Sequence, residues 1–311
     1  MGLVRSDITY PGYSEKDRAE IKEAVERMLS NDDKFAKKYL LPVGVLLTSH
    51  PGNTPFLTAS VKTHKKLGFW LTLTFDNYLN PERLNDLEYK DILPAKDVMQ
   101  YVDNFILSPH QVWGGVMYPY FWQLKVGINA LSEFAYIFCS NGDVILEKPE
   151  NFPKIMELLG DNDIMGCGWE DNQGRPCFNT TSFIAKTDAA KAVMKHFQDH
   201  FIPFDVYEIY TQDFGNTEAR FARAINELGL KQVIVEPTYN MQSHVKGYGT
   251  WYHVLGFRHI HAEYKYCQQH KMEPIELEYL DERFLNHSEY ALLKQYKETG
   301  DRQFLEKWWA S

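Results

Sequence analysis

The sequence has few cysteines and no long apolar run, and each shortage excludes a class of protein. Its four cysteines show neither CxxC spacing nor the density of a disulfide scaffold, which predicts a chain that stays reduced. No stretch approaches the roughly 18 uninterrupted apolar residues that a membrane-spanning helix needs. The first residues hold no apolar core of signal-peptide length. We therefore expect a cytoplasmic protein without an integral membrane segment.

Basic charge is also in short supply. The chain has 33 Lys and Arg against 42 Asp and Glu, which gives a formal net charge of −9. Domains that bind nucleic acid by bulk charge usually carry a clear basic excess, so this class of protein is disfavoured. A local patch of Lys62, Lys65, Lys66 and Arg258 keeps DNA open as a substrate without favouring it.

Several catalytic motifs are missing. GxxxxGK[ST] is absent, no GxGxxG follows the first expected strand, and there is no GxSxG. These absences disfavour P-loop, dinucleotide-dependent and α/β-hydrolase enzymes. The segment 258–261 (Arg-His-Ile-His), with Cys267 and His270 nearby, matches no zinc-binding spacing, and we expect no zinc site there.

What is present predicts an α/β protein. The apolar run at 43–48 is typical of a buried parallel strand, and a helix is expected from Thr54-Pro55 to Gly68, followed by a strand at 69–75. Strand, helix and strand form a βαβ unit, which implies a parallel sheet. Further strands are expected at 104–107, 134–139, 164–167, 178–185 and 233–235, and further helices at 120–131, 152–159, 188–200 and 217–228.

The expected organisation is one catalytic domain with an addition at each end. Residues 1–40 form a helical segment, and residues 251–311 form a C-terminal extension. Between them lies a mostly parallel Rossmann-like sheet flanked by helices, with a nucleotide-binding half at 41–143 and an acceptor half at 144–250. From Pro237 we expect a loop-rich chain, up to a final helical stretch at 288–309.

Polar residues follow three of the expected strands. Ligands of open parallel sheets bind at the carboxyl ends of the strands, so these residues are candidates for one site. Each cluster alone is more often a plain turn, since Asp, Asn and Gly are common turn formers, but three clusters at one sheet edge favour a site. The clusters are Thr48-Ser49-His50, Asp76-Asn77 and Asn141-Gly142-Asp143.

In this order, the segments resemble a glycosyltransferase of the GT-A fold. Residues 43–53 resemble the nucleotide-binding start of that family, and Asp76 lies where its members often hold the base or ribose. Residues 138–143 occupy the place of its Asp-x-Asp segment. Residues 166–169 and 178–184 resemble the loop and strand that line the acceptor side.

The resemblance implies transfer of a sugar from a nucleotide-diphosphate donor to a hydroxyl acceptor, with a glycan, a small molecule and a modified DNA base as open alternatives. Glu218 is the expected general base, because a helix N-terminus keeps a carboxylate ionised, and Asp213 is its rival. The remaining implied site residues are Thr48, Ser49, His50, Asp76, Asn77, Asn141 and Asp143 for the nucleotide sugar, and Gly168, Trp169 and Asn179 on the acceptor side.

A divalent cation, Mn²⁺ or Mg²⁺, is implied at Asp143, Asn141 and His244, where it neutralises the diphosphate leaving group. A histidine ligand suits Mn²⁺ better than Mg²⁺. Asn141 replaces the first acidic residue of Asp-x-Asp with an uncharged amide, which weakens metal binding. Two other functions stay open: a nucleotidyltransferase, whose glycine- and basic-rich loop is not seen at 48–53, and a catalytically silent protein that binds sugar nucleotides.

Overall fold

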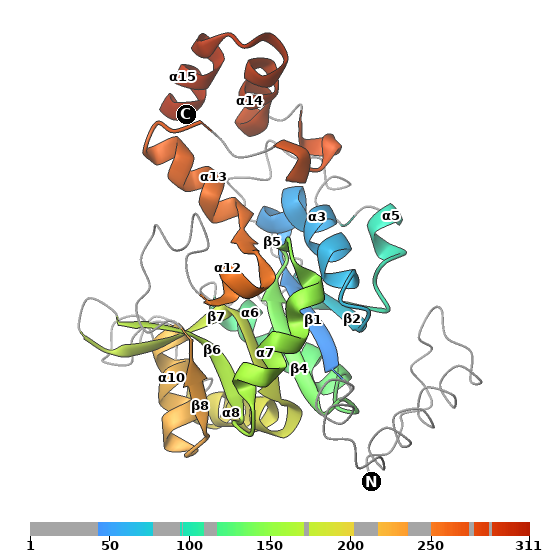
Figure 1. Cartoon of the computed structure of the whole chain (residues 1–311), viewed down its shortest axis with the longest axis vertical. Helices are drawn as coiled ribbons and strands as arrows, with labels where there is room; N and C mark the ends of the chain where they lie inside the picture. Colours follow the sequence, from blue (N-terminus) through green and yellow to red (C-terminus); the bar gives the residue numbers. More distant parts are fainter. Residues whose placement is uncertain are drawn as a thin grey trace.

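The computed structural model describes residues 43–76, 94, 96–108, 117–170, 174–201, 217–235, 250–273, 277–285 and 288–311 (Figure 1). The N-terminal segment 1–40, with its expected helix, lies outside the described residues. Among the helices that are described, none has both the length and the apolar character that a bilayer crossing requires.

Seven strands form a central sheet in the order β3-β2-β1-β4-β7-β6-β8. All neighbours in the sheet pair in parallel except β7, which is antiparallel to both β4 and β6. The mostly parallel, Rossmann-like sheet that the sequence predicts is therefore confirmed. The strands are β1 (Val43–Ser49), β2 (Trp70–Asp76), β3 (Asn104–Ser108), β4 (Tyr136–Asn141), β6 (Ile164–Glu170), β7 (Pro176–Lys186) and β8 (Gln232–Ile234).

Helices cover both faces of the sheet, because successive residues of a buried strand point to opposite faces. On one face, Leu47 and Phe138 pack against α3, α7 and α12. On the other, Leu46 and Ile137 pack against α6, α8 and α10. The helices around the sheet are α3 (Thr54–Lys65), α5 (Lys96–Met99), α6 (Met117–Ala130), α7 (Phe152–Leu159), α8 (Thr187–Phe201), α10 (Thr217–Glu227) and α12 (Thr250–Leu255).

The strand order reverses between β1 and β4. From β1 the chain builds β2 and β3 on one side, and it then returns to add β4 on the other side. In open α/β sheets, ligands bind where the order reverses in this way, outside the carboxyl ends of the strands. The residues that end and follow β1 and β4 are therefore placed where a ligand is expected.

The C-terminal region differs from the sequence-based prediction of a loop-rich chain. After α12, the chain forms β9 (Phe257–His259) and then α13 (Ile260–Gln269). β9 pairs antiparallel with β5 (Val144–Leu146), the short strand that follows Asp143. A strand of three residues is too short to show an alternating pattern, which is why periodicity did not reveal it.

The single helical stretch expected at 288–309 is two helices, α14 (Ser288–Thr299) and α15 (Arg302–Ala310). Gly300 separates them with a φ of +70°, and the Asp301 side chain caps α15 by accepting a hydrogen bond from the Gln303 amide. α13, α14 and α15 extend beyond the sheet at one end of the molecule (Figure 1).

Candidate active site

The carboxyl ends of β1 and β4 lie side by side and hold the turn that carries Asp143. Thr48 pairs with Asn141 in the parallel register, and its hydroxyl donates a hydrogen bond of 3.1 Å to Oδ1 of Asn141. The Gly142 amide donates to the Thr48 carbonyl at 2.7 Å. β1 therefore orients the turn directly through its last residues.

The structure describes only some of the other candidate residues from the sequence. Asp76 is the last residue of β2, whose Phe75 pairs with Ser49, so its backbone lies at the same edge of the sheet. Its side chain lies outside what the structure describes. Three more candidates lie wholly outside the described residues: Asn77, Asp213 and His244.

Gly142 fits between its neighbours only because it has no side chain. A Cβ at this position would lie 2.5 Å from the hydroxyl oxygen of Ser49 and 3.0 Å from Cδ1 of Leu57. Overpacking of this kind costs roughly 1–3 kcal/mol. We expect Gly142→Ala to lower the free energy of unfolding by about 1–3 kcal/mol and, under the function proposed below, to weaken nucleotide-sugar binding, because Asp143 must move with the turn.

Gly68→Ala is the matched control for this prediction. Gly68 lies before β2, at the opposite edge of the sheet, with a φ of +76° and open space around it. A Cβ there costs roughly 1–2 kcal/mol through backbone strain alone. Thermal unfolding and calorimetric titration with a nucleotide sugar compare the two variants. Unchanged binding by Gly142→Ala would contradict the prediction.

Asp143 is a buried carboxylate with only 2% of its surface exposed. Its Oδ2 accepts a hydrogen bond of 2.8 Å from Nε2 of His259 and lies 3.8 Å from Nδ1 of His261. Burial alone would raise the pKa of Asp143, but the nearby histidines, His259 above all and His50 to a lesser degree, hold it well below its ordinary range. Asp143 is therefore anionic at neutral pH.

The other carboxylate oxygen, Oδ1 of Asp143, is buried and accepts no hydrogen bond from the part of the chain that the structure describes. A buried anionic oxygen without a donor is costly, since desolvation is then uncompensated. Such an oxygen fits a ligand that brings a positive charge or a hydrogen-bond donor. The described residues therefore supply a hydrogen-bond donor to only one of the two carboxylate oxygens of Asp143.

The two histidines beside Asp143 differ in charge. Burial lowers the pKa of His259, but the charge and hydrogen bond of Asp143 outweigh burial, and the pKa is raised overall. Burial dominates at His261 and lowers its pKa to about 3, so this ring is neutral. The segment 258–261, for which the sequence predicted no zinc site, therefore supplies polar partners of Asp143, whereas the expected His244 lies outside the described residues.

Glu218, the expected general base, lies in the first turn of α10 and is half-buried. Burial raises the pKa of Glu218 to about 7, although the Thr180 amide and the charge of His259 lower it. Burial therefore opposes the ionisation that the helix N-terminus was expected to favour. A carboxyl group with a pKa near 7 is well matched to proton transfer at neutral pH.

Tyr120 and Glu218 share a backbone partner, Thr180. Its hydroxyl donates a hydrogen bond of 2.7 Å to the Thr180 carbonyl, and the side chain of Thr48 is also within hydrogen-bonding reach. Burial raises the pKa of Tyr120, so its proton is retained. Sequence reasoning missed this residue, because a tyrosine on the apolar face of α6 has the spacing of an ordinary core residue.

The residues expected on the acceptor side show only local contacts in the described part of the chain. Gly168 follows an irregularity in the pairing of β6 with β7 and lies opposite Phe178. Asn179 is buried, and its Oδ1 accepts a hydrogen bond of 2.8 Å from the amide of Thr181, which is a local backbone contact. The side chain of Trp169 lies outside the described part.

No protein family model matches the chain, and no curated protein matches it. Solved structures do. A 4-diphosphocytidyl-2C-methyl-D-erythritol synthase from Anaerococcus prevotii DSM 20548 is 12% identical with a TM-score of 0.41, covering 64% of this chain and 90% of its own. A nucleotide-diphospho-sugar transferase from Desulfovibrio desulfuricans G20 is 10% identical with a TM-score of 0.39, covering 86% and 97%.

Mouse xyloside xylosyltransferase 1 is 11% identical with a TM-score of 0.35, covering 63% of this chain and 84% of its own. Two of these three proteins are by name a nucleotide-diphospho-sugar transferase and a xylosyltransferase. What the site can do follows from the sheet topology and from the residues around Asp143 and Glu218.

Those residues do not form a complete metal site by themselves. Among the described residues, no group of three or more His, Cys, Asp or Glu side chains is arranged to hold a metal ion. Asp143 offers its Oδ1, whereas Nε2 of His259 donates to the other carboxylate oxygen. Mg²⁺ and Mn²⁺ sites that act on phosphates often use one or two protein ligands and take the rest from the substrate.

Proposed function

We propose that this chain is a glycosyltransferase that moves a sugar from a nucleotide-diphosphate donor to a hydroxyl acceptor. The observation that carries the proposal is a pair of carboxyl groups with opposite character: Asp143, buried in the turn after β4, is anionic, and Glu218, half-buried at the start of α10, has a pKa of about 7. Both lie within reach of the charge of His259. Carboxyl groups whose pKa values are pushed apart mark distinct acid, base and electrostatic roles.

Asp143 fits a divalent cation. An anionic carboxylate repels a diphosphate unless a cation lies between them, and the buried Oδ1 is available to such an ion. When bound, Mn²⁺ or Mg²⁺ supplies positive charge that neutralises the leaving nucleoside diphosphate. Asp143 would hold it through Oδ1, with Asn141 contributing only a carbonyl oxygen that already accepts from Thr48, while His259 stays the hydrogen-bond donor to Oδ2 of Asp143.

Residues of the chain itself would bind the nucleoside and remove the acceptor proton. In the proposal, Thr48, Ser49 and His50 bind the nucleoside together with Asp76 and Asn77, and Glu218 removes the proton of the acceptor hydroxyl, with Asp213 as the alternative base. General base catalysis of this kind contributes about 10²–10⁴-fold. Gly168, Trp169 and Asn179 lie on the acceptor side of the sheet in this assignment.

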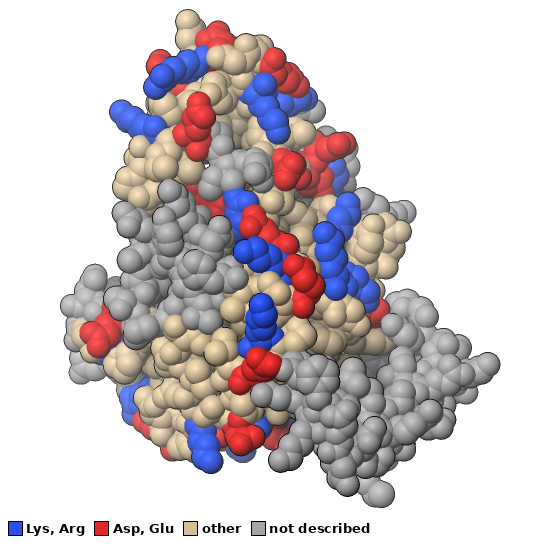
Figure 2. Space-filling model, in the orientation of Figure 1, with Lys and Arg blue, Asp and Glu red and all other residues tan. Residues whose placement is uncertain are grey.

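DNA is not favoured as the acceptor. The patch proposed for it is partly neutralised, because Lys65 contacts Asp103 and Arg258 contacts Glu147 and Glu263. Lys and Arg side chains alternate with Asp and Glu across the middle of the face in Figure 2. A glycan or a small metabolite therefore fits the charge distribution better than a polyanion.

Protection of the protein by nucleotide sugars against thermal unfolding tests the proposal. A ligand at 100 times its Kd stabilises the folded state by about 2.7 kcal/mol, so a screen of donors with and without Mn²⁺ is expected to raise Tm for one donor class. Asp143→Asn is expected to remove the part of the shift that depends on Mn²⁺. A screen in which no nucleotide sugar raises Tm would contradict the proposal.

The same preparation separates the alternatives by product. A glycosyltransferase releases a nucleoside diphosphate from the donor, whereas a nucleotidyltransferase releases pyrophosphate from a nucleoside triphosphate. Thr48 to Asn53 contains no Lys or Arg to hold a triphosphate, which favours the first reaction. Binding of a donor without transfer to any hydroxyl acceptor would instead identify a catalytically silent protein.

A further inference from the structure

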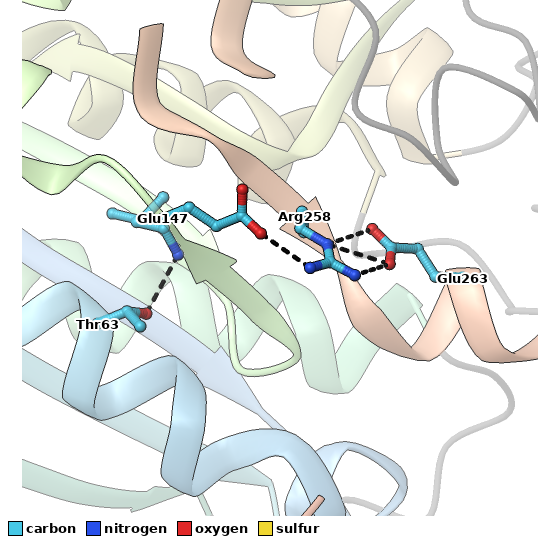
Figure 3. Close-up of polar contacts among 5 residues, drawn as sticks. Thr63, Glu147, Arg258 and Glu263 are labelled. Atoms are coloured by element: carbon cyan, nitrogen blue, oxygen red, sulfur yellow. Dashed lines mark hydrogen bonds and ion pairs between the residues drawn. The ribbon is translucent and has the colours of Figure 1, made fainter. Parts of the chain in front are cut away.

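Arg258 lies at the centre of a buried ionic cluster next to the candidate active site (Figure 3). Its Nη1 donates to Glu147 at 2.8 Å and its Nη2 donates to Glu263 at 2.8 Å. Nε contacts both oxygens of Glu263, at 3.2 and 3.3 Å, so Arg258 and Glu263 form a bidentate ion pair. The guanidinium also lies 5.2 Å from the centre of the Tyr279 ring.

The cluster is buried and joins three elements. Glu263, in α13, is fully buried, and Arg258, in β9, is 9% exposed, whereas Glu147, directly after β5, is partly open to solvent. A buried charge must be paired and hydrogen-bonded to be tolerated, so the position of each partner constrains the others. The planar fork of arginine also fixes orientation, which a lysine does not do.

The strand pairing between β5 and β9, which places His259 beside Asp143, is short. β5 and β9 share three residue pairs, in which Val144 lies opposite His259 and Ile145 lies opposite Arg258. An isolated two-stranded ladder is marginally stable at best. Arg258 and His259 are neighbours on one strand and therefore point to opposite faces, so that the ionic cluster fixes β9 from one side while His259 reaches Asp143 on the other.

We infer that Arg258, with Glu147 and Glu263, is a positioning residue that sets the contact between His259 and Asp143. The catalytic consequence depends on the proposed function, but the positional one does not. The local chain supports this role, since Gly256, just before β9, approaches Glu147 so closely that a Cβ would lie 2.7 Å from the Glu147 Cβ. Main-chain bonds from Glu147 and Lys148 to Gly256 and Leu255 continue the ladder there.

A double variant, Arg258→Met with Glu263→Met, tests the inference. Replacing both members of a buried ion pair by apolar side chains is often neutral for stability, so Tm is expected within about 3 °C of wild type. The ¹⁵N shift of the His259 imidazole, assigned with His259→Asn, is expected to move away from the wild-type value. Turnover is expected to fall about 10–100-fold in kcat with a smaller change in the donor KM.

A second variant and a control complete the test. Glu147→Gln removes the more exposed partner and is expected to shift the His259 signal in the same direction, which keeps the inference testable even where the double variant fails to fold. Arg283→Met removes an arginine that forks onto Asp281 away from β5 and β9, and it is expected to leave His259 unchanged. A wild-type His259 shift in Glu147→Gln and in a folded double variant overturns the inference. Lack of turnover in the wild type would count against the proposed function alone, because the NMR measurement does not need a substrate.

Discussion

Asp143→Asn is expected to reduce turnover by about 10³-fold while the chain still folds. The amide keeps the shape of the carboxylate, so the turn after β4 is retained, but it removes the negative charge that faces His259. Loss of one preorganised electrostatic group typically costs about 10²–10³-fold, and loss of cation binding adds to it. The rate of nucleoside diphosphate release, measured over a range of Mn²⁺ concentrations, checks this result.

Asp163→Asn is the matched control for Asp143. Asp163 also has a lowered pKa, because Lys186 hydrogen-bonds to it, but it lies at the surface near the amino end of β6. Its replacement is expected to change turnover by less than about twofold, since surface ion pairs contribute only about 0–1 kcal/mol. If Asp143→Asn and Asp163→Asn both kept near-full turnover, Asp143 would not belong to the active site.

Glu218→Gln is expected to lower kcat by about 10²–10⁴-fold and to abolish its dependence on pH near neutrality. In the wild type, a base with a pKa of about 7 must lose its proton to act, so activity is expected to rise with pH through about 7. Glutamine keeps the size of the side chain and cannot accept the proton. The pH profile of kcat for wild type and variant measures this directly.

Glu218→Gln, which is expected to lower kcat, is expected to raise the stability of the folded chain. The pKa of Glu218 in the folded chain, about 7, lies above its ordinary value of 4.5, so the folded state binds the proton more tightly than the unfolded state. Stability of the wild type therefore falls as pH rises from about 4.5 to about 7, and Glu218→Gln is expected to be more stable by about 1–3 kcal/mol above pH 7.

Denaturant unfolding at pH 5 and pH 8 checks the stability prediction. Glu227→Gln, on the same helix, is the control: Arg223 and His196 contact Glu227 at the surface and its pKa is lowered, so its variant is expected to lack the gain at pH 8. Equal stability changes for the two variants at both pH values would show that burial of Glu218 does not raise its pKa.

How much of this site could be predicted from the sequence differs from residue to residue. The buried run ending at Thr48 and the apolar strand ending at Asn141 were both visible as local patterns, and parallel strands place such ends at one edge. Tyr120 had no local signal that separated it from a core aromatic. Its contact with Thr180, 60 residues away, depends on how α6 packs across the sheet.

The sequence by itself determined the α/β class, the strands β1 to β4 and the polar residues at their ends, because hydrophobic periodicity is carried by residues that are neighbours in the chain. Only the tertiary structure decided which groups face Asp143. His259 is 116 residues away and reaches it through the three-residue pairing of β5 with β9. The tertiary structure also decided the protonation of Glu218, since burial is set by the packing of distant elements and no local pattern encodes it.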